Sequence, residues 1–186
     1  LPQDSFCLEI ITLIFPQLKN ISLFKNLNEY TKNNITSQDF IFLISLMIID
    51  ETDNSEYFLY KFNISNEDKK RIRLLQNVFS KPLDRKTFSE KNLWKMLYYN
   101  NKNYLNDLIN FQIYRSKKID KKLIKLKEFF SNQLPPKFNV KAKFLMEKFN
   151  LKEGKELGQK IKEIEIAWIN NSFKITDKQI EKIING

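Results

Sequence analysis

The chain has 186 residues, of which 42% are hydrophobic and 29% are charged, and its formal net charge is +10. This length suits one domain or two small domains that share a core, and the apolar content predicts a folded protein rather than a disordered one. Histidine is absent and Cys7 is the single cysteine, which excludes an internal disulfide, zinc-finger and HExxH metal sites, and His-dependent catalytic dyads. We expect a soluble, cytoplasmic protein.

The first part of the chain contains its longest apolar run. Residues 40–49, FIFLISLMII, fall short of the roughly 20 residues needed to cross a bilayer, so they predict a buried helix with Ser37 as its N-cap. No membrane association is expected. The chain opens on Leu1 without an initiator Met or a basic leader, and we therefore expect a piece of a longer protein.

Helical spacing continues through the rest of the chain, which has only three glycines and five prolines. Further N-caps are predicted at Ser65, with Asp68 three residues later, and at Ser89, before an apolar stripe. Thr176 and Gln179 have the spacing of a capping box. The predicted fold class is all-α, a compact array of roughly nine helices without strands or a 20 to 50 residue repeat.

Prolines and glycines punctuate residues 134–158, LPPKFNVKAKFLMEKFNLKEGKELG. Pro135 and Pro136 should end a Lys-rich helix near Gln133, because neither can donate a backbone hydrogen bond. A short helix should follow within FNVKAKFLMEKFN. Gly154 is expected in the turn that starts the next helix, or at a bare helix N-terminus that receives a phosphate, and Gly158 is expected where another helix crosses closely.

Charge is segregated along the chain. Residues 1–68 carry a net charge of −6, residues 69–162 carry +17, and residues 163–186 carry −1. Lys outnumbers Arg 28 to 4, which indicates a coding bias toward lysine, but such a bias does not explain this asymmetry. A polyanionic partner is favoured over a merely solvated surface.

The densest basic cluster is predicted to lie on one helix, with Ile119, Leu123, Ile124 and Leu126 facing inward. Lysine is a flexible point charge that suits phosphates better than base edges. The residues predicted to contact this polyanion are Lys117, Lys118, Lys121, Lys122, Lys125, Lys137, Lys141, Lys143, Gly154, Lys155 and Lys160.

Catalytic and metal-binding patterns are scarce. The sequence has no phosphate-binding P-loop and no Gly-rich dinucleotide fingerprint. Asp50, Glu51 and Asp53 could bind a divalent ion, but a solvated turn is the favoured interpretation. We predict no catalytic residue, no metal ligand and no cofactor in this chain.

Four parts of the chain match the pattern of one known family: EIITLIFPQLKNISLFKNL, FNISNEDKKRIRLL, LWKMLYYNNKNYLNDLI and the residues from 134 onward. Over nearly its whole length the chain thus resembles the class II branch of the bacterial tRNA nucleotidyltransferase and poly(A) polymerase family. The first part is similar to a family segment with an IFPEL core, the second to its L-x-x-S-N-x-[DE] helix start, and the third to its body helix pair. Residues from 134 onward resemble the tail's series of proline, DLM, G-x-x-[LIV]-G and W-[IV]. Ala142 and Phe144 depart from the Gly and the acidic residue that the family commonly has.

The resemblance implies that residues 1–114 form a helical body and residues 115–186 a basic helical tail, both of which hold tRNA. Family members add CCA or A tails to RNA 3′ ends with a head domain that uses Mg²⁺ and takes ATP and CTP as substrates. The head's Gly-Ser loop, DxD carboxylates and ExxR helix do not occur in these residues. The chain is therefore expected to bind tRNA, not DNA, and to catalyse nothing by itself.

Two other functions remain open from the sequence. A helical protein-interaction module could use the basic face to meet an acidic partner. A basic amphipathic element on a membrane surface is less favoured, because the apolar helix faces are needed for a core. The sequence leaves open which nucleotides the parent protein adds and its oligomeric state.

Overall fold

The computed structural model describes residues 5–84 and 86–186, and the regular structure within these ranges is entirely helical. The described residues form eleven α-helices and two short 3₁₀-helices, compared with the roughly nine helices expected, and the all-α prediction is confirmed. The α-helices are α1 (Ser5–Ile14), α2 (Glu29–Asn34), α3 (Phe40–Ile48), α4 (Asn54–Lys61), α5 (Asn66–Phe79), α6 (Glu90–Tyr99), α7 (Lys102–Arg115), α8 (Lys121–Ser131), α9 (Ala142–Phe149), α10 (Lys155–Asn170) and α11 (Asp177–Asn185). The 3₁₀-helices are η1 (Ile21–Lys25) and η2 (Ile35–Ser37).

The chain divides into two compact units, residues 1–134 and residues 135–186. The division expected from the sequence falls after residue 114, with α8 in the tail. In the structure α8 packs against α7 and therefore belongs to the first unit. No helix in the described ranges combines the length and the apolar character needed to span a membrane.

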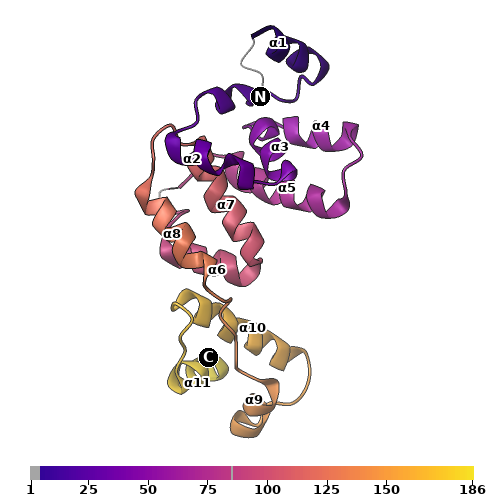
Figure 1. The fold of residues 1–186 in the computed structure, drawn as a ribbon. Coiled ribbons are helices and arrows are strands. Elements are labelled where there is room, and N and C mark those ends of the chain that lie inside the picture. Colours follow the sequence, from indigo (N-terminus) through magenta and orange to yellow (C-terminus); the bar gives the residue numbers. More distant parts are fainter. Residues whose placement is uncertain (1–4, 85) are drawn as a thin grey trace. The chain divides into compact units, whose positions relative to one another are not determined.

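The core of the first unit is built around α7, which packs against α3, α5, α6 and α8 (Figure 1). Leu105, Leu108, Ile109 and Phe111 of α7 are fully buried. The Phe111 ring centroid lies 4.4 Å from that of Phe79. An apolar set that covers almost the whole circumference of a helix is typical of a helix buried on all sides, which explains why α7 is central.

Short polar side chains begin most helices of this unit by accepting amide hydrogen bonds. Ser65 accepts from the Asp68 amide and Ser89 from the Asn92 amide, so both predicted N-caps are confirmed. The predicted N-cap at Ser37 is wrong. Asp39 caps α3 by accepting from the Phe42 amide at 2.9 Å, because a carboxylate one residue before the apolar run reaches the first free amides better than Ser37, which ends η2.

Arg71 on α5 joins three elements of the first unit through charged hydrogen bonds. Its Nε and Nη2 donate to the Asp107 carboxylate on α7 at 2.6 and 2.8 Å, and Nη1 and Nη2 donate to Asp39 at 2.9 and 2.7 Å. Burial raises the pKa of Asp39, but hydrogen bonds from Arg71 and the Phe42 amide, with the Arg71 charge, outweigh it and lower the pKa. Burial raises the pKa of Asp107 despite Arg71. The network therefore fixes α3, α5 and α7 together.

The second unit has a much smaller core. Leu145 of α9, Leu157 and Ile164 of α10, and Ile180 of α11 form its buried cluster. The predicted Thr176–Gln179 capping box begins α11 and is confirmed.

Polar contacts join the three helices of the second unit. Lys148 of α9 forms an ion pair with Asp177 of α11. Lys160 of α10 donates to the carbonyl of Ile183 at 2.6 Å, where a cation complements the exposed carbonyls of a helix end.

The prolines and glycines of residues 134–158 act as expected except at Gly158. The Lys-rich helix α8 ends at Ser131, just before Pro135 and Pro136, and the next helix starts only at Ala142. Gly154 is the N-cap of α10 with φ of +155°, a conformation that favours glycine. The predicted close crossing at Gly158 is wrong, because a Cβ placed there meets nothing within 4 Å.

Candidate nucleic-acid interface

The predicted lysine cluster at residues 117–125 lies at the junction of α7 and α8 and not on a single helix. Lys117 and Lys118 precede α8, whereas Lys121, Lys122 and Lys125 lie on it. All five side chains are exposed, and within the described residues none of the five has an ion pair. Ile119 was expected to face inward but is 45% exposed, because it lies in the loop and outside the helical period. The lysines therefore present uncompensated positive charge.

The loop that carries Lys117 and Lys118 is anchored at its start. Asn28, the N-cap of α2, donates from Nδ2 to the carbonyl of Ser116 at 3.0 Å. The Ser116 hydroxyl in turn donates to the Gln112 carbonyl at 2.8 Å. These bonds hold the loop on the first unit, so the two lysines have a fixed backbone and exposed side chains.

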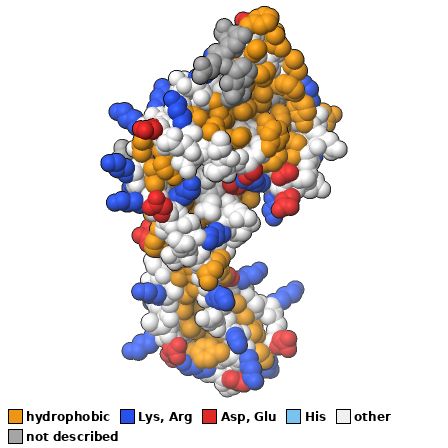
Figure 2. Space-filling view, in the orientation of Figure 1, with side chains coloured by type: hydrophobic (Ala, Val, Ile, Leu, Met, Phe, Trp, Pro, Cys, Tyr) orange, Lys and Arg blue, Asp and Glu red, His pale blue; other side chains and the backbone are white. Residues whose placement is uncertain are grey.

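The inner face of α8 is fastened to the core. Leu123 and Phe130 are buried, and Ile124 and Leu126 pack against the same core, as expected. Phe130 also packs edge-on against Trp94 of α6, with ring centroids 5.2 Å apart. The outer face is therefore held rigidly with its lysines outward, and Figure 2 shows Lys and Arg side chains along the edge of the first unit where Figure 1 labels α8.

The N-terminus of α8 is capped by the protein itself. The Asp120 carboxylate accepts from the amides of Lys122 and Leu123 at 2.9 and 3.1 Å. A bound anion would therefore meet lysine side chains and not free backbone amides. This arrangement suits extended contact with several phosphates more than capture of one phosphate at a helix end.

An open hollow of about 500 Å³ adjoins the α8 lysines. It is lined by Lys121, Lys122, Lys125, Leu126 and Phe129 of α8 and by Glu90 of α6. Phe129 is 43% exposed and lies four residues after Lys125, on the same helix face. An aromatic ring among lysines is a combination found where proteins bind single-stranded nucleic acid, because a base can stack while phosphates meet the cations.

Sequence reasoning missed Phe129 and Glu90. Phe129 comes eight residues after Lys121 and four after Lys125, so all three lie on one face of the helix. This spacing could have identified Phe129 as part of the site. Glu90 could not have been found, since it comes from α6 and approaches only in the folded chain.

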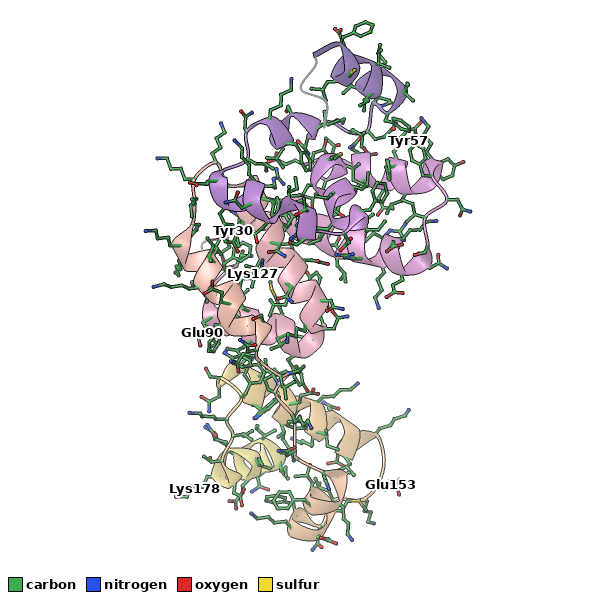
Figure 3. The ribbon with its side chains drawn as sticks, viewed as in Figure 1. Tyr30, Tyr57, Glu90, Lys127, Glu153 and Lys178 are labelled. Atoms are coloured by element: carbon green, nitrogen blue, oxygen red, sulfur yellow. The ribbon has the colours of Figure 1, made fainter. Side chains whose placement is uncertain are left out.

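Lys127 differs from the other lysines of α8. Its amine lies over the Tyr30 ring at 6.0 Å, and Figure 3 labels the two residues close together. Burial lowers the pKa of Lys127, and burial also raises the pKa of the Tyr30 hydroxyl. Lys127 therefore stabilises the packing of α8 on α2 and is not part of the outer basic face.

The predicted RNA-contacting residues of the second unit have different roles. Lys137, Lys141, Lys143 and Lys155 are exposed, with Lys143 3.8 Å from Glu147. Gly154 is exposed and provides no side-chain cap to α10. The Lys160 side chain is only 18% exposed and its amine is bonded to Ile183 and paired with Glu163, so we leave Lys160 out of the candidate interface.

The acidic turn after α3 forms a local structure of its own. Asp50 accepts from the amide and the hydroxyl of Thr52 at 2.9 and 2.6 Å and pairs with Lys19 at 3.4 Å. In the described part of the chain no group of three or more Asp, Glu or Cys side chains is placed to hold a metal ion. The Asp50 carboxylate is therefore held by Thr52 within the turn and by Lys19.

Comparison with known proteins finds no match: no family model, no curated protein and no solved structure is significantly similar to this chain.

Proposed function

We propose that this chain is the RNA-holding part of a tRNA nucleotidyltransferase or poly(A) polymerase, and that the α7–α8 junction is its main RNA-binding face. The observation that carries the proposal is a set of five exposed lysines that form no ion pair within the described residues. Three of them, Lys121, Lys122 and Lys125, line the hollow that contains Phe129. The resemblance of the sequence motifs to that family points to tRNA as the polyanion. Catalysis would come from a head domain whose motifs lie outside these residues.

The electrostatics of the face favour a phosphate backbone. Lysine amines repel one another when several are close, and a row of phosphates relieves this repulsion while releasing condensed counterions. Among the described residues that line the hollow, the acidic one is Glu90. It lies at the start of α6, where the helix dipole stabilises its negative charge. Glu90 would limit how far phosphates extend toward α6, so the RNA backbone should follow α8 and the preceding loop.

The experiment compares the affinity of two lysine variants for unmodified tRNA by fluorescence anisotropy. The test variant replaces Lys117, Lys118, Lys121 and Lys122 with Gln, which removes four charges and keeps helix propensity. The matched control replaces four exposed lysines of the second unit, Lys162, Lys174, Lys178 and Lys182, with Gln.

Both variants have the same net charge, so a difference between them reports location. The test variant should bind tRNA at least about tenfold more weakly than the control, since it loses several lysine–phosphate contacts at once. Equal affinities would contradict the proposed face. Competition with an acidic polypeptide that displaces tRNA completely would favour the protein-interaction alternative.

Phe129→Leu separates base stacking from charge. The leucine keeps an apolar side chain beside Trp94 and Phe130 but removes the aromatic surface on which a base stacks, a contribution of about 1–3 kcal/mol per base. Affinity for a single-stranded RNA should fall about fivefold or more. Unchanged affinity would remove Phe129 from the face and leave the lysines.

The chain alone should transfer no nucleotide. Incubated with tRNA, ATP, CTP and Mg²⁺, it is expected to leave the 3′ end unchanged. Labelled CMP or AMP on the tRNA would overturn the assignment of catalysis to a separate head.

A further inference from the structure

The hollow beside α8 is lined by hydrogen-bonding groups of two kinds, from two different helices. Lys121, Lys122 and Lys125 of α8 have ammonium groups that only donate hydrogen bonds, whereas Glu90 of α6 has a carboxylate that only accepts them. Phe129 lines the same hollow. A site with donors from one helix and an acceptor from another can distinguish ligands by the order of their own donors and acceptors.

The Phe129 ring has surface left for stacking. It is 43% exposed, and the neighbouring rings of Trp94 and Phe130 meet it edge-on, at interplanar angles of 84° and 88°. Unpaired nucleobases stack on aromatic side chains that are exposed in this way. A base stacked on Phe129 would turn its polar edges toward the other side chains of the hollow.

Glu90 lies where it can meet an edge of such a base. It comes four residues before Trp94, so the two side chains share one face of α6 and lie one helical turn apart. The Trp94 ring centroid is in turn 6.2 Å from that of Phe129. Glu90 is exposed, and within the described residues its carboxylate has no ion pair or hydrogen-bond partner. Both carboxylate oxygens are therefore left to accept hydrogen bonds from a ligand.

The four RNA bases differ in the groups along their edges. Guanine has two neighbouring donors, N1–H and the N2 amino group, and beside them two acceptors, O6 and N7. Adenine and cytosine each have one donor next to an acceptor, and uracil has one donor between two acceptors. A carboxylate can accept two parallel hydrogen bonds from guanine alone, and a lysine ammonium suits guanine O6 and N7. Guanine thus matches both kinds of group in the hollow.

We infer that the hollow binds an unpaired guanine of the RNA, an inference that rests on the RNA-binding face proposed for the α7–α8 junction. The guanine stacks on Phe129, and its N1–H and N2 amino group donate to the Glu90 carboxylate. Lys125, one turn before Phe129 on α8, donates to O6 or N7. Lys121 and Lys122 are left for phosphates. Glu90 is therefore the residue that determines which base is preferred.

The inference is tested with labelled single-stranded RNAs made of uridine, with guanine, adenine, cytosine or uracil at the central position. Fluorescence anisotropy at one salt concentration measures their affinities. The wild-type chain should bind the guanine oligomer about five- to tenfold more tightly than the other three, the low end for a bidentate contact because water reaches Glu90. Hypoxanthine in place of guanine lacks the N2 amino group and should remove most of this preference.

Glu90→Gln tests the residue itself. The amide has one donor and one acceptor, so the guanine preference should disappear, and the adenine oligomer should gain affinity relative to the uracil oligomer. Glu128→Gln is the matched control, because it removes the same charge from an exposed residue of α8 that does not line the hollow. It should keep the guanine preference. Equal binding of the four oligomers by the wild type, or a guanine preference that survives Glu90→Gln, would overturn the inference.

The same oligomers separate a failure of this inference from a failure of the RNA-binding face. The variant with Gln in place of Lys117, Lys118, Lys121 and Lys122 is measured beside the wild type. If it binds every oligomer more weakly but the wild type shows no preference for guanine, the face stands and the guanine site is wrong. If it binds every oligomer as tightly as the wild type, the face is wrong and the guanine site fails with it.

Discussion

The two units of the chain are stabilised by different means. In the first unit, large buried side chains such as Phe42, Phe111 and Tyr114 form a core that extends across several helices. In the second unit, the buried cluster consists of Leu145, Leu157, Ile164 and Ile180. A small unit buries a smaller fraction of its surface and is correspondingly marginal. The second unit therefore depends more on polar contacts between its helices, such as the ion pair of Lys148 with Asp177.

The difference in core size between the two units is matched by a difference in what their lysines do. In the second unit Lys148 and Lys160 are used to join helices, through Asp177 and through the carbonyl of Ile183. In the first unit the apolar core, together with Lys127 on Tyr30, fixes α8, so the outer lysines of α8 are left without a structural task. A well-packed scaffold thus leaves charge available for binding, whereas a small one uses part of its charge for folding.

The strongest test of this comparison removes the same side chain from each core. Leu145→Ala in the second unit and Leu108→Ala in the first both remove a fully buried leucine, a change that costs about 2–5 kcal/mol. The marginal second unit should unfold, so the amides of α9, α10 and α11 should lose hydrogen-exchange protection. Leu108→Ala should lower the melting temperature while α3, α5 and α7 stay protected at low temperature.

Hydrogen exchange read by mass spectrometry distinguishes the two variants segment by segment. If Leu145→Ala leaves α9 to α11 protected, the second unit has stability that its core does not explain. If the variant also exposes α7, the two units unfold as one.

The next test concerns Arg71, whose side chain is 28% exposed and bonds the Asp107 carboxylate, which is 10% exposed. Arg71→Leu leaves that carboxylate without its counter-charge and should cost about 2–3 kcal/mol, below the full value for a buried pair because water reaches the site. Arg73→Leu, on the same helix, breaks a pair with Glu56 in which both side chains are about half exposed. It should leave the urea midpoint nearly unchanged.

The Arg71 network also predicts a pH dependence. The pKa of Asp39 is lowered in the folded chain, so its contribution is present at neutral pH and is lost as the pH falls below about 4, toward the lowered folded pKa. Arg71→Leu should reduce this acid-dependent loss. If the free energy of unfolding falls equally with pH in the wild type and in Arg71→Leu, then Arg71 does not control the pKa of Asp39.

A smaller effect is expected from the capping box of α11. Thr176→Ala removes the acceptor for the Gln179 amide and should destabilise the second unit by about 1 kcal/mol. Thr176→Ser keeps the hydroxyl and serves as the control. In a Trp94→Phe background Trp168 of the second unit is the remaining tryptophan, so urea unfolding followed by its fluorescence measures both variants. Equal midpoints would show that the cap contributes little.

The smallest effect has the opposite sign. Gly158 lies inside α10 with no heavy atom within 4 Å of an added Cβ, so Gly158→Ala should stabilise the second unit by about 0.5–1 kcal/mol through helix propensity. Gly154→Ala should instead destabilise it, because φ of +155° is rarely adopted with a side chain. If Gly158→Ala is less stable than the wild type, another helix does cross closely at Gly158, as expected from the sequence.

Local signals in the sequence predicted the helices well. Ser65, Ser89 and Thr176 cap helices as their spacing indicated, because a cap depends on residues three positions apart. Positions decided by tertiary packing were not predictable. The solvent exposure of Gly158 and the assignment of α8 to the first unit both depend on which helix packs where.

For the candidate site, the sequence showed where the lysines are, but not which of them contact other parts of the fold and which are left for binding. Lys127 and Lys160 have the same chemistry as Lys121 and Lys122, and only the folded chain shows that the first pair is partly buried against Tyr30 and Ile183. Phe129 has a helical spacing that could have been read from the sequence. Its exposure beside Glu90 could not.

The most direct test of the RNA-binding face is the salt dependence of tRNA binding. For the wild-type chain, the logarithm of the affinity should fall linearly with the logarithm of the salt concentration, with a slope near −0.9 for each phosphate neutralised in duplex regions. Replacing Lys117, Lys118, Lys121 and Lys122 with Gln should make this slope shallower by about three units, whereas replacing Lys162, Lys174, Lys178 and Lys182 should leave it unchanged. Equal slopes for all three proteins would contradict the claim that the α7–α8 junction holds the RNA.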